Sequence, residues 1–241
     1  MSAYGEDLAY IHDKGFGDYA RNAAPGLLRI LRRNRIRKSL VVDLGCGSGI
    51  WARELSLSGY DVLGVDVSPS MVRLARRNAP EARFVTGSLL SVSLPPCGAV
   101  TAIGECVNYL LDPASGKTAL QRLFHKIYRA LCPGGILAFD FAQPGMGGRK
   151  NFFVGEDWAV LSESVEHRTR RELTRNITFF RKIGSRYRRG DEIHKLRLYD
   201  RREMMAMVEN AGFRARLHPG YGSFRLPGSR AVIVAVKLAR R

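Results

Sequence analysis

Long apolar runs, paired cysteines and a basic leader are all missing from this chain. No stretch reaches the roughly 18 consecutive apolar residues that a membrane-spanning helix needs. Residues 1–7 are polar and acidic, whereas a signal peptide begins basic and then becomes apolar. None of the four cysteines forms a Cys-x-x-Cys pair, which argues against a zinc site and a disulfide framework: Cys46, Cys97, Cys106 and Cys132. We therefore expect a cytoplasmic protein with no membrane partner and no metal.

Acidic residues are also few, and the 22 of them against 39 lysines and arginines leave a net charge of +17. A basic run over residues 29–38 contains no acid, but eight acidic residues accompany the eleven basic ones of residues 151–200. Because the charge is spread along the chain, an arginine-rich surface is favoured, and an RNA-binding face stays open. The 241 residues, 45% of them hydrophobic, can bury one substantial core, with room for an insertion.

A short apolar strand followed by three glycines is the central local pattern. Residues 40–44 are apolar and β-branched around Asp43, as in a buried parallel strand, and Gly45, Gly47 and Gly49 follow at every second position. This order predicts a strand, a tight turn and the start of a helix. Glycine suits the turn because a Cβ would hold a ligand off the backbone and because positive φ angles strain other residues.

Two carboxylates distinguish this turn from a dinucleotide site. A dinucleotide fingerprint has its third glycine three positions after the second, whereas Gly47 and Gly49 are two apart. Asp43 would repel a pyrophosphate but attract the ammonium group of a methionine-like moiety beside a sulfonium. Asp66, at the end of a second strand over residues 60–65, can accept both hydroxyls of a ribose. The pattern predicts a site for S-adenosylmethionine.

These segments resemble the signature segments of a known enzyme family. Residues 41–49, Asp66 and residues 131–137 are similar to those of class I S-adenosylmethionine-dependent methyltransferases. Residues 15–20 and 104–110 are similar to bacterial small-molecule members, including sugar-amine N-methyltransferases. The resemblance implies an enzyme with an α/β fold, in which a Rossmann-like seven-stranded sheet carries helices on both faces and its last strand is antiparallel.

The cofactor is expected to contact residues from the glycine turn, from the ends of the strands and from an N-terminal aromatic lid. These residues are Tyr10, Tyr19, Asp43, Gly45, Cys46, Gly47, Asp66, Val67, Met71, Ser88, Leu89 and Gly104. Tyr10 and Tyr19 could place a ring beside the sulfonium, with packing on the core as the alternative. Met71 could likewise pack in the core instead of contacting the cofactor. Ser88 stands where many relatives carry an acid, and its hydroxyl can accept one hydrogen bond without adding charge.

The methyl acceptor should lie at the end of the strand predicted over residues 99–103, since open α/β sheets bind ligands at the carboxyl ends of their strands. The segment that follows, residues 104–109, lacks the Pro-Pro-aromatic motif of exocyclic-amine nucleic-acid methyltransferases. We expect N- or O-methylation of a small-molecule acceptor. Four residues are candidate bases: Glu105, His194, His12 and Tyr221. The positions of Glu105 and His194 in the predicted fold favour these two. The alternatives are an RNA methyltransferase and a non-catalytic S-adenosylmethionine-binding protein.

An insertion interrupts the regular alternation of helices and strands. Glycines within residues 145–148 follow the fifth strand, and the next stretch is rich in β-formers, with a hairpin turn at Gly184-Ser185. We expect three antiparallel strands over residues 158–199 that cover the methyl site and help to bind the acceptor. The alternative is a sheet that pairs between subunits, so the chain is expected to be a monomer or a homodimer.

The predicted organisation has three parts. Residues 1–150 form the lid helices and the cofactor-binding core, residues 151–200 form the β insertion, and residues 201–241 supply a helix and strands that complete the sheet. Three caps are predicted within it: Ser68 starts a helix, Asp112 starts a helix that ends at residue 129, and Asp200 starts a helix that ends at residue 211.

Overall fold

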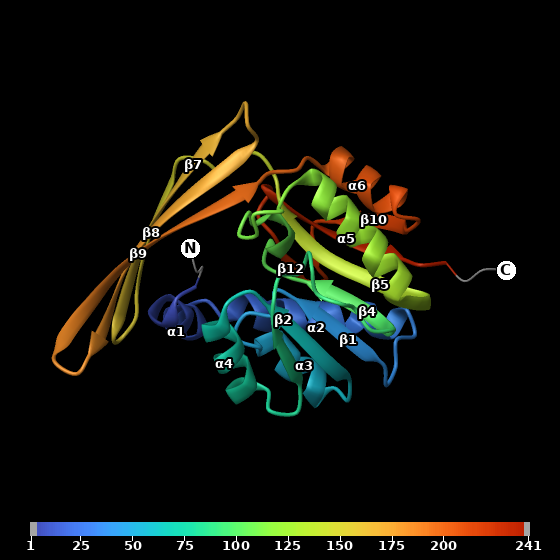
Figure 1. Ribbon diagram of the computed structural model, residues 1–241, viewed down its shortest axis with the longest axis horizontal. Helices are drawn as coiled ribbons and strands as arrows, with labels where there is room; N and C mark the ends of the chain where they lie inside the picture. The colour runs from blue at the N-terminus through green and yellow to red at the C-terminus, as the bar shows by residue number, and fades with distance from the viewer. Residues whose placement is uncertain (1–3, 239–241) are drawn as a thin grey trace.

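The computed structural model describes residues 4–238, and a seven-stranded sheet forms its core (Figure 1). The strands are β1 (Leu40–Leu44), β2 (Asp61–Asp66), β3 (Arg83–Thr86), β4 (Cys97–Ala102), β5 (Leu131–Ala142), β10 (Arg214–His218) and β13 (Arg230–Val236). They are arranged in the order β10-β13-β5-β4-β1-β2-β3, with β13 antiparallel to both of its neighbours. The predicted fold class is confirmed. Residues 1–3 and 239–241, at the ends of the first and third predicted parts, lie outside the described residues.

Helices cover both faces of this sheet. On one face lie α2 (Asp18–Arg33), α3 (Ile50–Leu57) and α4 (Pro69–Asn78), and on the other lie α5 (Lys117–Ala130) and α6 (Arg201–Asn210). Each helix buries an apolar stripe, such as Leu120, Leu123, Phe124 and Ile127 of α5. None of the helices within residues 4–238 is long and apolar enough to cross a bilayer.

Side-chain caps explain where two of these helices begin. The Ser68 hydroxyl accepts the Met71 N–H at 3.2 Å before α4, and Asp200 accepts the Glu203 N–H at 2.8 Å before α6, as predicted. The predicted start of α5 at Asp112 is wrong, because that helix begins at Lys117. The Asp112 carboxylate instead accepts the Ala114 N–H at 2.8 Å in a local turn. It therefore does not cap α5.

The insertion is a separate antiparallel sheet, which we call the roof sheet. Its strands, in spatial order, are β6 (Arg149–Val154), β7 (Trp158–His167), β8 (Glu172–Ile183) and β9 (Arg186–Arg197). Figure 1 shows its long hairpins projecting from the body of the molecule. The turn at Gly184-Ser185 is confirmed by the pairing of Ile183 with Arg186. The three antiparallel strands predicted over residues 158–199 are confirmed as β7, β8 and β9, and β6 is a fourth strand that was not predicted. All six residues of β6 are exposed, so no burial pattern marks it.

An apolar cluster and a buried asparagine are among the contacts that hold the roof sheet in place. Helix α1 (Glu6–Gly15) packs on it through an apolar cluster that includes Leu8, Ile11 and Trp158. Asn108, in the short helix η1 (Cys106–Asn108), donates hydrogen bonds to the carbonyls of Ala142 at 3.0 Å and Arg197 at 2.6 Å. The side chain thereby joins η1 to the ends of β5 and β9, and this helps to fix the roof sheet above the carboxyl ends of the core strands.

Candidate functional site

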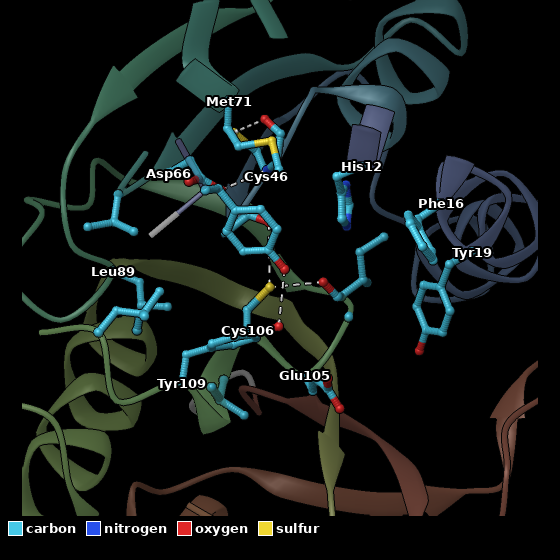
Figure 2. A pocket seen from close by; sticks show the side chains of 18 of the residues that line it. His12, Phe16, Tyr19, Cys46, Asp66, Met71, Leu89, Glu105, Cys106 and Tyr109 are labelled. Atoms are coloured by element: carbon cyan, nitrogen blue, oxygen red, sulfur yellow. Dashed lines mark hydrogen bonds between the residues drawn. The ribbon is translucent and has the colours of Figure 1, made fainter. Parts of the chain in front are cut away.

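A cavity of about 520 Å³ lies where the carboxyl ends of the core strands meet α1 and the roof sheet. This volume falls within the range of small-molecule sites. Figure 2 shows His12, Phe16 and Tyr19 on one side of the cavity, Leu89 on the other, and Glu105 and Tyr109 below. The cavity therefore draws its lining from the N-terminal helices, the core and the insertion.

The three glycines of the first turn serve different purposes. All three have positive φ angles, of 72° at Gly45, 53° at Gly47 and 80° at Gly49. A Cβ on Gly45 would lie 2.5 Å from the Cys106 sulfur, and one on Gly49 would lie 2.8 Å from the Ala75 Cα, so both glycines permit close packing. A Cβ on Gly47 would meet no atom within 4 Å. Gly47 is thus the position at which the backbone is open to a ligand.

Asp43 is buried with one of its two carboxylate oxygens unpaired. The residue is 1% exposed, and Oδ1 accepts the Thr101 hydroxyl at 2.8 Å, while Oδ2 has no hydrogen-bond partner among the described residues. Burial raises the pKa of Asp43 to about 7. A buried carboxylate oxygen without a donor is costly, and a ligand ammonium group would satisfy it. The arrangement fits the amino group of a methionine moiety.

Asp66 faces the same cavity from the end of β2. Its Oδ2 accepts the Gly47 N–H at 2.9 Å and its Oδ1 accepts the Ser68 N–H at 2.9 Å, so the carboxylate is held in one orientation. Burial raises the pKa of this group as well. Each oxygen retains a lone pair for a further donor, which is what the two hydroxyls of a ribose require.

Most of the residues expected at the cofactor site line this cavity. They are Tyr19, Asp43, Gly45, Cys46, Gly47, Asp66, Val67, Met71, Ser88, Leu89 and Gly104, together with the candidate base Glu105. Tyr10 does not line it. The Tyr10 hydroxyl donates to Asp157 at 2.8 Å and the Arg181 guanidinium lies 3.8 Å from the centre of its ring, so Tyr10 joins α1 to the roof sheet.

The predicted base His194 does not line the cavity either. It is 1% exposed, its Nε2 is 2.9 Å from Glu192, and the Tyr4 ring packs on it with centroids 4.8 Å apart. Glu192 also accepts the backbone N–H groups of Tyr4 and Gly5, at 2.8 and 2.9 Å. His194 and Glu192 therefore hold the N-terminal segment, which covers the imidazole.

Glu105 does line the cavity, but two arginines already hold its carboxylate. Arg175 of β8 donates to Oε1 at 2.9 Å, and Arg230 of β13 lies 2.8 Å from Oε2 in an ion pair without hydrogen-bond alignment. The Glu105 side chain is 3% exposed. A carboxylate compensated by two guanidinium groups is a structural anion, so its geometry does not suit proton abstraction.

Sequence reasoning missed the residues that the roof sheet contributes. The strand register aligns them in rows: Arg149, Ser164 and Arg175; then Asn151, Ser162 and Ile177; then Phe153 and Val160. The rows change from cationic near the core to apolar near α1. Alternate residues of β6 and β7 face the cavity, as the two-residue period of a strand requires. No alternation of polar and apolar residues over 149–154 marked these positions of β6 in the sequence.

The aromatic wall was predicted only in part. Tyr4, His12 and Phe16 line the cavity beside Tyr19, and Tyr109 lines it from the end of η1. Burial lowers the pKa of His12 to about 4, so the imidazole is neutral at physiological pH. Within residues 4–238 no group of three or more His, Cys, Asp or Glu side chains could hold a metal ion.

Comparisons with known proteins agree with this geometry. Residues 41–135 match the family model described as a methyltransferase domain. Over 94% of its length the chain is 27% identical to the dTDP-3-amino-3,6-dideoxy-alpha-D-glucopyranose N,N-dimethyltransferase of Streptomyces fradiae, of which 93% is covered.

Solved structures share the fold along nearly the whole chain. An S-adenosylmethionine-dependent methyltransferase from Clostridium acetobutylicum superposes with a TM-score of 0.81 at 19% identity, covering 97% of this chain and 98% of that one. An amino pentose methyltransferase from Micromonospora echinaspora, solved with S-adenosylmethionine bound, has a TM-score of 0.74 at 21% identity, with 98% of each chain covered. These similarities extend through the roof sheet as well as the core.

Proposed function

We propose that this chain, a class I S-adenosylmethionine-dependent methyltransferase, transfers the methyl group to a nitrogen atom of a small, anionic acceptor such as a nucleotide-linked amino sugar. The observation that carries the proposal is the division of one cavity into an acidic end at Asp43 and Asp66 and an arginine-rich end below the roof sheet.

The acidic end suits the cofactor. S-adenosylmethionine supplies a methyl group on a sulfonium, which is already activated for in-line displacement. Asp43 would accept the amino group on its unpaired Oδ2, Asp66 would accept the ribose hydroxyls, and the open backbone at Gly47 lets the ligand approach. The aromatic wall of Tyr4, Phe16 and Tyr19 would exclude water from the reacting atoms.

The opposite end suits an anionic acceptor. Arg149, Arg175 and Arg230 line it, Glu105 lies between Arg175 and Arg230, and the buried Asp140 is also close to Arg230. Their guanidinium groups exceed the carboxylate charge beside them, and such groups recognise phosphate and carboxylate by paired hydrogen bonds. The named function of the Streptomyces fradiae relative, dimethylation of a dTDP-linked amino sugar, supports this class of acceptor.

The surroundings of the candidate bases Glu105 and His12 favour nitrogen over oxygen as the acceptor atom. A neutral amine attacks without losing a proton first, whereas a hydroxyl gains from a base whose pKa is near the working pH. On the acceptor side Glu105 is held by arginines, and the pKa of His12 is about 4. The arginines also disfavour the protonated, unreactive form of an amine.

The high net charge does not lead to an RNA acceptor. The arginines and the lysine of the basic run at residues 29–38 are exposed, and the run lies where α2 ends and β1 begins. Asp43 and the cavity stand at the other end of β1, roughly 15 Å away at about 3.3 Å per residue. The cations of this run therefore lie at the end of β1 that is remote from the site of methyl transfer.

The test is a methylation assay on a matched panel. It contains dTDP-linked amino sugars, the same amino sugars without a nucleotide, and dTDP-linked sugars without an amine. We expect methylated product, detected by mass spectrometry, from the first group alone, and calorimetric binding of S-adenosylhomocysteine but not of NAD. Methylation of the amine-free sugars, or of RNA in preference to the panel, would contradict the proposal.

A further inference from the structure

The backbone at the end of β4 adopts an unusual conformation at two successive residues. Gly104 has a φ of 85° and Glu105 a φ of 59°. Glycine reaches this left-handed region freely, but a residue with a Cβ adopts it at a cost and needs other contacts to hold it there. Glu105 is 2% exposed, so the conformation is imposed inside the protein, at the ligand edge of the sheet.

Asp140 supplies those contacts. Its Oδ1 accepts the Gly104 N–H at 2.7 Å and its Oδ2 accepts the Glu105 N–H at 2.9 Å, so one carboxylate binds both residues of the left-handed pair. The Tyr221 hydroxyl donates to Oδ1 at 2.8 Å and fixes the carboxylate in turn. Asp140 is 0% exposed and does not line the cavity, so it acts on the site through its neighbours: it holds the Glu105 backbone, and its charge lies close to Arg230.

The backbone conformation of Glu105 determines where the charged side chains at the acceptor end of the cavity lie. With its backbone held by Asp140, the Glu105 carboxylate lies between Arg175 from the roof sheet and Arg230 from the core sheet. Both arginine side chains line the cavity and are less than one-fifth exposed. A flip of the 104–105 backbone would turn the carboxylate away and leave the two guanidinium groups without their common anchor.

We propose that Asp140 is a positioning residue for the acceptor side of the site: it holds Gly104 and Glu105 in the left-handed conformation that places Arg175 and Arg230 against the acceptor. This role rests on the proposed function for its substrate, but the backbone contacts are independent of any acceptor. Of the expected cofactor contacts, the carboxylates Asp43 and Asp66 do not bond to Asp140, and Gly104 does so only through its backbone N–H. The acceptor half of the cavity should therefore respond more strongly than the cofactor half.

Two variants and a control test this role. Asp140→Asn keeps the shape but turns one acceptor oxygen into a donor that faces an N–H group. Asp140→Asn combined with Glu105→Gly restores a residue that tolerates the conformation but removes the carboxylate. Asp61→Asn, at an exposed position at the start of β2, is the matched control. The measurements are the KM for the acceptor found with the panel, the dissociation constant of S-adenosylhomocysteine, and hydrogen exchange at the amides of residues 104 and 105.

For Asp140→Asn we expect faster exchange at both amides, a KM for the acceptor raised at least about tenfold, and an affinity for S-adenosylhomocysteine that changes by much less than this KM. The double variant should keep the high KM although glycine removes the strain. Recovery of the KM in the double variant, or a parallel loss of S-adenosylhomocysteine affinity in the single one, would overturn the role. If the wild-type protein methylates no member of the panel, the proposed function fails, whereas unchanged amide exchange in Asp140→Asn overturns the positioning role itself.

Discussion

The unpaired carboxylate of Asp43 makes a prediction that links cofactor binding to stability. Replacing Asp43 with asparagine keeps the volume of the side chain and its contact with Thr101, but removes the charge. We expect Asp43→Asn to be more stable than the wild type at pH 8 in the absence of cofactor, and to bind S-adenosylhomocysteine more weakly. Cofactor affinity and stability should thus change in opposite directions.

The pKa of Asp43 sets the size of the effect on stability. Burial raises it from 3.8 to about 7, and at 1.36 kcal/mol per pKa unit this corresponds to about 4 kcal/mol. Because the pKa is raised in the folded state, the protonated carboxyl contributes stability below about pH 4, and this is lost as the pH rises through 7. The variant should therefore match the wild type near pH 4 and exceed it at pH 8 by up to about 4 kcal/mol.

The loss of cofactor affinity follows from the missing charge-assisted hydrogen bond. Such a bond contributes about 1.5–3 kcal/mol, which corresponds to a dissociation constant raised roughly 10- to 100-fold. Wild-type affinity for S-adenosylhomocysteine should also fall below pH 7, where Asp43 becomes protonated.

Urea unfolding at pH 4 and pH 8 measures the first effect and calorimetry at pH 8 the second, with Asp61→Asn as the control. Equal stability of variant and wild type at pH 8 would mean that Asp43 carries no desolvation cost. Unchanged affinity would mean that the amino group of the ligand binds elsewhere.

Two further substitutions test the cofactor site and the packing of α2 near Tyr221. Asp66→Ala removes the carboxylate expected to accept two ribose hydroxyls, so calorimetry should show S-adenosylhomocysteine binding weakened at least about tenfold in a folded protein; an unchanged constant would place the ribose elsewhere. Gly26→Ala puts a Cβ 2.2 Å from the Tyr221 carbonyl oxygen, and such overpacking typically costs 1–3 kcal/mol. Its midpoint of thermal unfolding should therefore fall by several degrees, and an unaltered midpoint would show that α2 can shift freely against β11 (Gly220–Tyr221).

Local signals were sufficient to predict the cofactor half of the molecule. The strand of residues 40–44, the glycine turn and the Ser68 cap all act through neighbours within a few positions, and each was found where predicted. Asp112 shows the limit of such signals. The same side chain can cap a helix or close a turn, and the choice depends on whether the next residues pack as a helix.

The acceptor half depends on strand register, which no short pattern encodes. Arg149 and Arg175 are 26 positions apart in the sequence, and they share a row only because two hairpins align both of them with Ser164. His194 belongs to the same row, opposite Arg175, yet Tyr4 covers it and Glu192 binds it.

For Glu105 the position was predicted from the sequence, but the role was not. Its place after β4 was predicted, and it does line the cavity, but a carboxylate at that edge could be a base, a ligand for an amine or a counter-ion. What distinguishes these roles is the pair of guanidinium groups that reach it from β8 and β13, 70 and 125 positions further along the chain. The position of a catalytic candidate can thus be predicted from local order, while its role depends on partners that only the assembled fold brings within hydrogen-bonding distance.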